Sequence, residues 1–351
     1  MRWCDGRDAC KGKNDCKGKG FVDDSSADAC LKKGGKVVEP KRCRVRSGEG
    51  PGTRAGPLIA HTARRRMEAG MACAVPYLGH GVGLRTKHFS RVLDGTAHVD
   101  WFEAISENFM IGGGRPLAVL ERARQACPLV IHGVSLSLGS TDPLNEAYLE
   151  ELARLARRFA PAWISDHLCW GSVGGHYAHD LLPLPLTEEA LAHVASRVEA
   201  VQDRLGRQIL VENVSSYLTY AHSTIPEWEF LAALAARADC GILLDVNNVY
   251  VSACNHGFDA ATYITAIPPA RVGQLHLAGH TDKGTHLLDT HVGPVPDPVW
   301  DLYRLALRHC GSVSTLVEWD EEVPELSVVV AEAERARTIA TEVLGTNAES
   351  A

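Results

Sequence analysis

The stretch Cys240-Gly-Ile-Leu-Leu-Asp-Val-Asn-Asn248 joins an apolar run to a group of polar side chains. The run predicts a buried β-strand, and Asp245, Asn247 and Asn248 lie where that strand ends. The same arrangement occurs eight times, with helical stretches between the runs. Apolar strands that alternate with helices predict a parallel sheet covered by helices, and eight such units predict a closed (β/α)8 TIM barrel of the α/β class.

Eight strands are therefore expected, at residues 80–85, 99–107, 128–136, 162–168, 208–214, 240–247, 271–277 and 313–319. In a barrel of this kind the chemistry gathers at the C-terminal ends of the strands. A single polar residue there can be a satisfied hydrogen-bonding group of the core, but eight such endings favour a shared site.

Charge and cysteine content divide the chain into unlike parts. Residues 1–66 hold 17 Lys and Arg against 8 Asp and Glu, whereas the remainder holds 19 against 35. Five cysteines lie in the first 43 residues, and six are scattered through the rest without a CxxC pair. We expect a Cys-rich, low-structure basic segment at 1–46, a linker at 47–74 and the barrel at 75–351.

Local end signals predict several helices and one long loop. Asp142-Pro143 is expected to open a helix that reaches Phe159, and Thr187 to cap one that ends near Gly206. Further helices are expected to start at Asp297-Pro298 and at Pro324. Residues 171–186 are expected to form a long loop at the functional end of the barrel.

The candidate ligands outnumber what one ion needs. Imidazole and carboxylate without clustered thiolate suit Fe, Mn, Zn or Co, so two or three carboxylate-bridged ions are expected. The predicted metal ligands are His88, His132, Asp166, Glu212, Asp245, His256, His276, Asp289, His291 and Glu318. Glu107, Asn213 and Asn247 are expected to act in catalysis by orienting ligands, and His167 and His280 to be ligands or orienting groups.

Ten motifs in the right order resemble the multinuclear non-heme iron-dependent oxidases, the family that includes methanobactin biosynthesis protein B. Among them are Trp101-Phe-Glu-Ala-Ile-Ser-Glu-Asn108, His132-Gly-Val-Ser-Leu-Ser137, Ser165-Asp-His-Leu-Cys-Trp170, His276-Leu-Ala-Gly-His280 and Asp289-Thr-His-Val-Gly293. The resemblance covers about residues 80–320 and implies a xylose-isomerase-like barrel with two or three irons in mixed Fe2+/Fe3+ states.

The same resemblance implies a substrate and partners. Family members use O2 to oxidise cysteines of a ribosomally synthesised precursor peptide, giving oxazolone–thioamide or thiooxazole groups. They usually work with a partner protein that recruits the peptide. The chain is thus expected to be a peptide-modifying oxidoreductase.

The N-terminal segment carries a resemblance of its own. Cys10-Lys-Gly-Lys-Asn-Asp-Cys16 and Ala29-Cys30-Leu-Lys-Lys-Gly-Gly35 are similar to the Cys-rich end of a bufferin-type precursor peptide, a substrate of this family. Three interpretations stay open for Cys4, Cys10, Cys16, Cys30 and Cys43. They are a substrate fused to its enzyme, a fusion or start-site artefact, or a disulfide or zinc module.

Other functions are weighed against the oxidase. The main rival is a divalent-metal sugar isomerase or endonuclease of the xylose-isomerase-like class, using Glu212, Asp245, His276 and Glu318. Metal storage by the N-terminal cysteines is a non-enzymatic alternative. No nucleotide-binding glycine motif follows a strand, and no apolar run approaches a membrane span. We expect a cytoplasmic enzyme without nucleic-acid or membrane partners.

Overall fold

The computed structural model describes residues 3–5, 21–23, 36–38, 73 and 75–348. The chain divides into two units, Met1–Ala60 and His61–Ala351. In the first unit, the strands β1 (Trp3–Asp5), β2 (Phe21–Asp23) and β3 (Lys36–Val38) form an antiparallel sheet in the order β2-β1-β3. The segment predicted to have little structure therefore contains a small sheet of three-residue strands.

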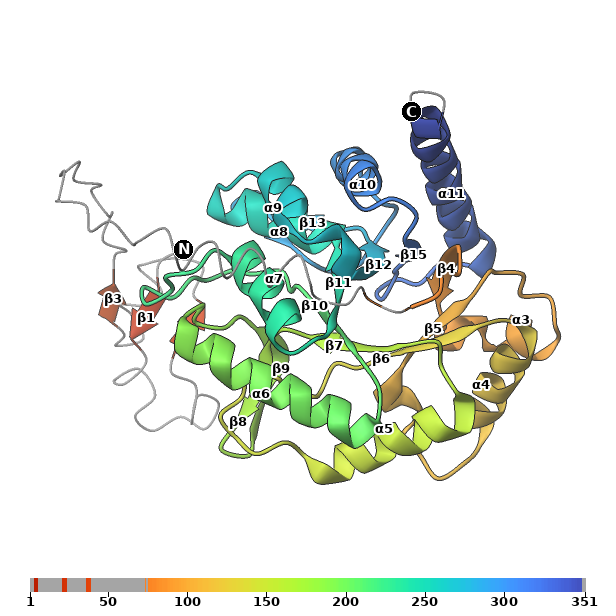
Figure 1. Ribbon diagram of the computed structural model, residues 1–351, viewed down its shortest axis with the longest axis horizontal. Coiled ribbons are helices and arrows are strands. Elements are labelled where there is room, and N and C mark those ends of the chain that lie inside the picture. The colour runs from red at the N-terminus through yellow and green to blue at the C-terminus, as the bar shows by residue number, and fades with distance from the viewer. Residues whose placement is uncertain (1–2, 6–20, 24–35, 39–72, 74, 349–351) are drawn as a thin grey trace. The chain divides into compact units, whose positions relative to one another are not determined.

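The second unit is a closed barrel of parallel strands, as predicted (Figure 1). Each of the eight expected ranges contains one barrel strand. The strands, in the order in which they are hydrogen-bonded, are β10 (Leu210–Glu212), β11 (Gly241–Asp245), β12 (Val272–Leu277), β15 (Ser314–Val317), β4 (His80–Gly83), β5 (Phe102–Ile105), β6 (Leu129–His132) and β7 (Ile164–His167).

Helices cover the barrel, and in Figure 1 α4–α6 and α8–α11 lie on opposite sides of its strands. The α-helices are α3 (Phe89–Leu93), α4 (Arg115–Ala126), α5 (Glu146–Phe159), α6 (Glu188–Leu205), α7 (Glu227–Arg237), α8 (Val246–His256), α9 (Ala260–Ala266), α10 (Asp297–Cys310) and α11 (Leu326–Ala348). Short 3-10 turns are η2 (Thr86–His88), η3 (Ser106–Phe109) and η4 (Pro269–Arg271). None of the described helices combines the length and apolar character needed to cross a bilayer.

Three of the expected helix ends are confirmed, and the expected start of α5 is wrong. Thr187 caps α6 by accepting the Ala190 amide, and α6 ends at Gly206 in a left-handed conformation. Helix α10 begins at Asp297, as predicted. Helix α5, however, begins at Glu146 with Asn145 as its cap, because the Asp142 carboxylate accepts the amides of Gly174 and Gly175 across the structure instead. The last helix begins at Leu326, two residues after Pro324.

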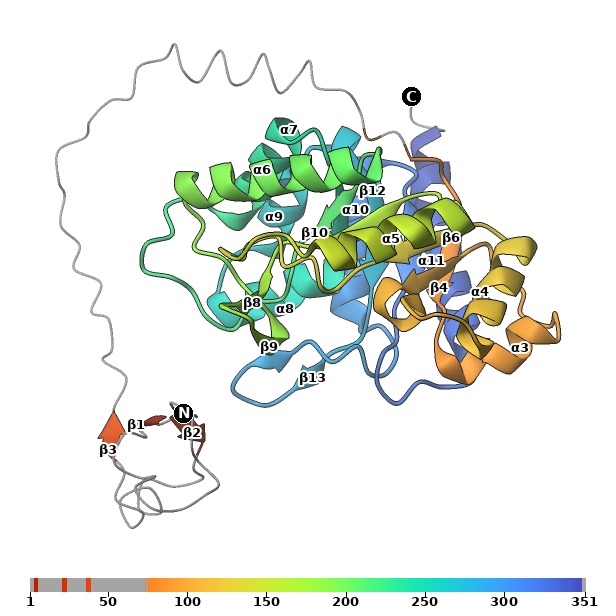
Figure 2. The same cartoon turned by 90° about the horizontal axis from the view of Figure 1, so that it is seen from below.

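The segment expected to be a loop at 171–186 is largely a β-hairpin. Strand β8 (Trp170–Val173) pairs with β9 (His176–Leu182) in antiparallel register. A second small hairpin joins β13 (Thr281–Asp282) to β14 (Leu287–Leu288). In Figure 2 both hairpins lie along the same edge of the barrel.

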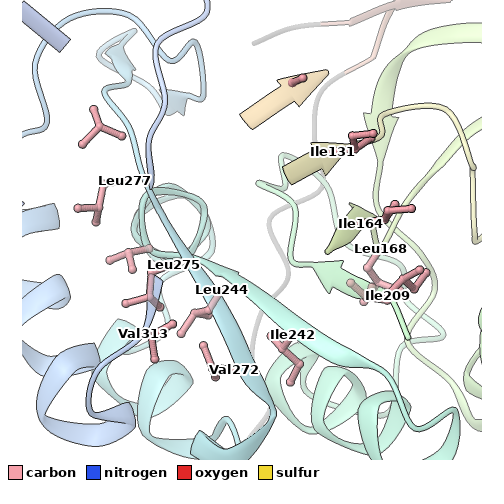
Figure 3. Packing of buried hydrophobic residues seen from close by; sticks show 14 of the residues in the cluster. Ile131, Ile164, Leu168, Ile209, Ile242, Leu244, Val272, Leu275, Leu277 and Val313 are labelled. Atoms are coloured by element: carbon pink, nitrogen blue, oxygen red, sulfur yellow. The ribbon is translucent and has the colours of Figure 1, made fainter. Parts of the chain in front are cut away.

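Side-chain alternation along the strands separates an outer core from the barrel interior. The outer core contains alternate strand residues such as Ile242, Leu244, Leu275 and Leu277, which Figure 3 shows packed among strands and helices. A second apolar cluster fills the lower interior of the barrel and consists of Trp101, Val130, Trp163, Leu210, Leu243 and Leu316. This apolar plug closes the barrel below the positions where polar side chains turn inward.

Candidate metal centre

Every strand of the barrel, or the residue that closely follows it, contributes at least one polar side chain to the interior above the apolar plug. In β12, for example, Leu275 and Leu277 belong to the outer core, so Gln274 and His276 face the interior. We call the resulting set the polar cluster. Its members are Arg85, Glu103, His132, His167, Glu212, Asp245, His276 and Glu318, joined from a loop by His291.

The polar cluster contains four overlapping groups of possible ligands, whose donor atoms lie within 4.8 Å of one another. The groups are His132–His167–Glu212, Glu103–His276–Glu318, Glu212–Asp245–His276 and Asp245–His291–Glu318. Because Glu212, Asp245, His276 and Glu318 each belong to two groups, adjacent ions could share these residues. This arrangement suits several neighbouring ions better than a single one.

The clearest group is formed by His132, His167 and Glu212. His132 Nδ1 lies 2.8 Å from Ser165 Oγ, and His167 Nδ1 lies 3.1 Å from the Gly133 carbonyl oxygen. With a proton on each Nδ1, both bonds are satisfied and both Nε2 lone pairs are free. The two Nε2 atoms lie 3.3 Å apart, and Glu212 Oε2 lies 3.3 and 3.4 Å from them. Donor atoms about 2.1 Å from one ion are separated by roughly this distance.

A second imidazole is held by a carboxylate. His276 Nε2 lies 3.2 Å from Glu103 Oε2, which also accepts a hydrogen bond of 2.7 Å from the Gln274 amide. The tautomer with its proton on Nε2 donates to Glu103 and presents Nδ1, which lies 3.1 Å from Glu318 Oε2 and 3.4 Å from Glu212 Oε1. The Gln274 amide nitrogen also lies 2.7 Å from His276 Nε2. In this tautomer Glu103 orients the His276 imidazole from behind, an arrangement that is common at metal sites.

Buried polar atoms without hydrogen bonds favour a bound cation at this place. Within the described part of the chain these include the carboxylate oxygens Glu103 Oε1, Glu212 Oε2 and Asp245 Oδ2. An unsatisfied buried carboxylate is costly, and a bound cation removes that cost. The residues present therefore fit a site for hard or borderline metal ions with N and O ligands.

Electrostatics in the polar cluster follow from burial and from mutual contact. Burial alone would raise the pKa of Glu212, but His167, His276 and His132 hold it at about 2. Burial and the neighbouring Glu212 raise the pKa of Asp245 well above its usual range. Burial lowers the pKa of His132, which favours the neutral imidazole that a metal requires.

Arg85 supplies a permanent positive charge at one side of the cluster. Its guanidinium pairs with Glu318 at 3.0 Å and with Asp320. A Cβ atom on Gly83 would approach the Arg85 guanidinium to 2.7 Å, so the glycine leaves the space that this group occupies. Arg85 therefore offsets part of the negative charge and fixes the Glu318 carboxylate.

The structure brings six of the ten predicted metal ligands into the groups, namely His132, Glu212, Asp245, His276, His291 and Glu318. Asp289 lies beside them, with Oδ1 2.8 Å from His291 Nε2. The other three lie outside the groups. Asp166 precedes His167 by one residue and faces outward, where it accepts the amides of His167 and Leu136. His88 contacts the Pro324 carbonyl, and His256 contacts Ser216.

The three residues expected to orient ligands also have defined contacts. Asn213 makes two hydrogen bonds to the backbone of Asp245. Its Oδ1 accepts the Asp245 amide at 2.9 Å, and its Nδ2 donates to the Asp245 carbonyl oxygen at 3.0 Å. Asn247 donates to Asp289 at 2.8 Å, while Glu107 accepts from the Tyr148 hydroxyl and the Val134 amide. Asn213 thus positions Asp245, a member of the polar cluster. Asn247 bonds to Asp289, which in turn contacts His291 of the cluster.

Sequence analysis missed Glu103 and left His167 undecided. Both are inward-facing members of their strands, Glu103 in the middle of β5 and His167 at the end of β7. Glu103 was not predicted because the candidate ligands were taken from the strand ends. The signal that identifies it is a charged residue between Phe102 and Ala104, which both belong to the outer core.

Above the polar cluster lies an open pocket of about 360 Å³. Its lining includes His132, His167, His291 and Glu318, together with Asp180 and Leu181 of β9. The polar cluster is therefore accessible from this end of the barrel, while the apolar plug closes the other.

Comparisons with known proteins identify the family. Residues 79–341 match the family model described as "RiPP precursor modification enzyme MbnB/TglH/ChrH". The chain is 63% identical over 269 residues to the UPF0276 protein Anae109_1558 of Anaeromyxobacter sp. (strain Fw109-5), covering 77% of this chain and 95% of the relative. It is 49% identical over 263 residues to a UPF0276 protein of Caulobacter vibrioides (strain NA1000 / CB15N), covering 75% and 94%.

Solved structures resemble the chain in fold. A D-tagatose 3-epimerase-like protein matches with a TM-score of 0.50 at 15% identity, covering 78% of this chain and 100% of that one. Endonuclease IV from Thermus thermophilus matches with a TM-score of 0.49 at 18% identity, covering 74% and 98%. At such identities the likeness concerns the barrel and not the chemistry. By the match of residues 79–341, the chain belongs to the family of RiPP precursor modification enzymes MbnB/TglH/ChrH.

Proposed function

We propose that the chain is a multinuclear, iron-dependent oxidase that modifies cysteines of a ribosomally synthesised precursor peptide with O2. The observation that carries this proposal is the set of four overlapping ligand groups sharing Glu212, Asp245, His276 and Glu318. A single-ion site needs three or four protein ligands. The eight possible ligand residues of these groups exceed that need and favour two or three ions.

The chemistry proposed for the substrate favours iron among the metals that the donor set admits. The ligand groups contain imidazole and carboxylate but no thiolate, which suits Fe, Mn, Zn or Co. Membership of a family that modifies RiPP precursors adds the requirement for a change in the peptide, and the proposal places this change at a cysteine. Bound iron would supply the redox chemistry with O2 and an acceptor for the substrate thiolate, neither of which a protein side chain provides.

The side chains of the chain itself have separate tasks in this proposal. Ser165 and the Gly133 carbonyl fix the tautomers of His132 and His167, and Glu103 does the same for His276. Arg85 holds Glu318 in place. The apolar plug excludes water from the lower side of the cluster, so substrate enters through the pocket lined by Asp180 and His291.

The substrate can reach the site in two ways. A separate precursor peptide, delivered by a recruiting partner protein, is the first. Residues 1–46, with cysteines at positions 4, 10, 16, 30 and 43, are the second and would act as a substrate in cis. Most of that segment lies outside the described residues, so its subdivision at residue 46 and the linker at 47–74 stay predictions.

Metal analysis tests the proposal. Protein produced in iron-rich medium is expected to contain two to three irons per chain and to consume O2 only when a cysteine-containing peptide is added. Replacing His132 and His167 together with Ala should reduce the iron content and abolish O2 uptake. Protein that contains zinc and no iron, and that consumes no O2 with such a peptide, would contradict the oxidase and favour a divalent-metal isomerase or endonuclease.

A further inference from the structure

The β8–β9 hairpin carries an irregularity that the metal centre does not explain. Trp170 pairs with Leu182 and Ser172 with Tyr177, so residues 178–181 of β9 lie opposite Gly171 alone. Within this bulge His179 has a φ of 55°, a left-handed conformation that is uncommon for a non-glycine residue. Bulges redirect side chains and often lie beside active sites.

The bulge lies between two hollows of about 360 Å³ each. One is the pocket above the polar cluster. The other lies between the loop that begins at Val134 and the hairpin, and its lining includes Tyr177 and His179. Because Val134, Asp180 and Leu181 line both hollows, the two adjoin one another. Together they have the size of a site for a short peptide rather than for a single side chain.

Asp180, at this junction, has a carboxylate without a cationic partner among the described residues. The side chain is exposed, and its Oδ1 accepts only the Leu181 amide, at 2.8 Å. Of the other carboxylates that line the pocket, Glu318 and Asp320 pair with Arg85 and Asp289 pairs with His291. Glu321 also lines this pocket, but unlike Asp180 it does not line the second hollow. An unpaired carboxylate beside a substrate path favours a cationic group on the substrate.

We propose that the substrate peptide extends from the metal centre into the second hollow and places a Lys or Arg side chain, near the modified cysteine, against Asp180. The inference rests on the proposed function for the position of the cysteine. It adds a specificity determinant, a positive charge close to the cysteine in the sequence. Exposed Tyr177, at 64% of its full accessibility, supplies an aromatic surface beside this path.

Binding without turnover tests the inference. The probe is a fluorescently labelled peptide with the sequence of residues 10–22, which contains two cysteines and four lysines, together with copies in which the lysines are replaced by Ala or by Glu. Affinities are measured without O2 on the iron-loaded full chain, on Asp180→Asn and on Asp180→Lys. Asp282→Lys is the matched control, because Asp282 is an exposed hairpin aspartate that likewise accepts a nearby amide.

For wild type and Asp282→Lys, the lysine peptide is expected to bind at least about fivefold more tightly than the Glu copy. Asp180→Asn should reduce this preference, and Asp180→Lys should reverse it. An unchanged preference in Asp180→Lys, or no binding of any peptide, would overturn the inference. Failure of the proposed function is visible separately, as absence of O2 uptake by wild-type protein with peptide that it binds.

Discussion

At the scale of single residues, the direction of a side chain decides its role. Asp166 and His167 are neighbours on β7, yet His167 faces the polar cluster and Asp166 faces outward. The sequence located the region of the strand ends but could not choose between adjacent residues there. A shift of one residue reverses the face of a strand, and no local pattern identified which face was inside.

Substitutions at this pair provide the first prediction. His167→Asn should remove bound metal from the group with His132 and Glu212, lowering the iron content by about one ion per chain and the activity at least tenfold. Asp166→Asn keeps an acceptor for the His167 amide and should retain most of its metal. Metal content per chain measures both variants. Equal loss of metal in both would show that Asp166 is a ligand after all.

Glu103 provides a second prediction. Because it accepts hydrogen bonds from His276 and Gln274, Glu103→Gln should disturb the tautomer of His276 and weaken metal binding by about 10- to 100-fold. Titration of metal-free protein with Fe2+ under anaerobic conditions measures this affinity. Glu107→Gln is the comparison, since Glu107 contacts Tyr148 and Val134 and no member of the groups. Wild-type affinity in Glu103→Gln would contradict its positioning role.

At the scale of helices and strands, a capping residue in the sequence predicted a helix start correctly only where its side chain bonds within the same helix. Thr187 caps its own helix and was identified correctly, whereas Asp142 bonds to the distant Gly174–Gly175 turn and was mistaken for a helix start. The hairpin at 170–182 was likewise missed, because its strands are short, exposed and bulged. In β5, outer-core residues alternate with interior residues, and this pattern in the sequence identifies Glu103 as an interior side chain.

Helix caps give a third prediction. Asn145→Ala and Thr187→Ala should each lower the free energy of unfolding by about 1 kcal/mol, because each removes the side-chain acceptor for a first-turn amide. Chemical denaturation measures the change. Ser90→Ala serves as a control in an exposed helix position without a cap bond. If Asn145→Ala is neutral, α5 is not held by this cap.

A contact between helices gives a fourth prediction. The Tyr263 hydroxyl of α9 donates to Glu227 of α7 at 2.8 Å, and burial raises the pKa of Glu227 to about 7. The folded protein therefore holds this proton more tightly than the unfolded chain, so the contribution of Glu227 to stability falls as pH rises from about 4.5 to about 7. Glu227→Gln should match wild type near pH 4 and be more stable by about 1–2 kcal/mol at pH 8. A stability difference independent of pH would refute this explanation.

At the scale of the whole molecule, the barrel was predictable because eight similar strand units recur in order, and burial on both faces makes each strand apolar. The site was predictable as a region, since barrel chemistry gathers at one end. Which residues belong to the site depends on side-chain direction and on the loops. His291 lies in a ligand group, whereas His88 and His256 lie outside the groups. The basic N-terminal part and the acidic barrel differ in charge, which agrees with a cationic substrate near Asp180.

Metal removal gives a fifth prediction for the entire barrel. Buried carboxylates of the polar cluster lose their counter-charge when the metal leaves, so a chelator should lower the melting temperature and Fe2+ should restore it. The protein with both His132 and His167 replaced by Ala should respond less to the chelator. A melting temperature that is the same with and without metal would mean that the cluster is stable without ions.

Mass spectrometry of the cysteine-containing peptide tests the central claim most directly. The iron-loaded chain is incubated with a precursor peptide, with and without O2, and both the peptide and residues 1–46 are analysed. We expect an O2-dependent loss of hydrogen mass located at a cysteine, either in the added peptide or in cis at positions 4 to 43. Iron-loaded wild-type protein that leaves every cysteine of both unmodified in the presence of O2 and the recruiting partner would contradict it.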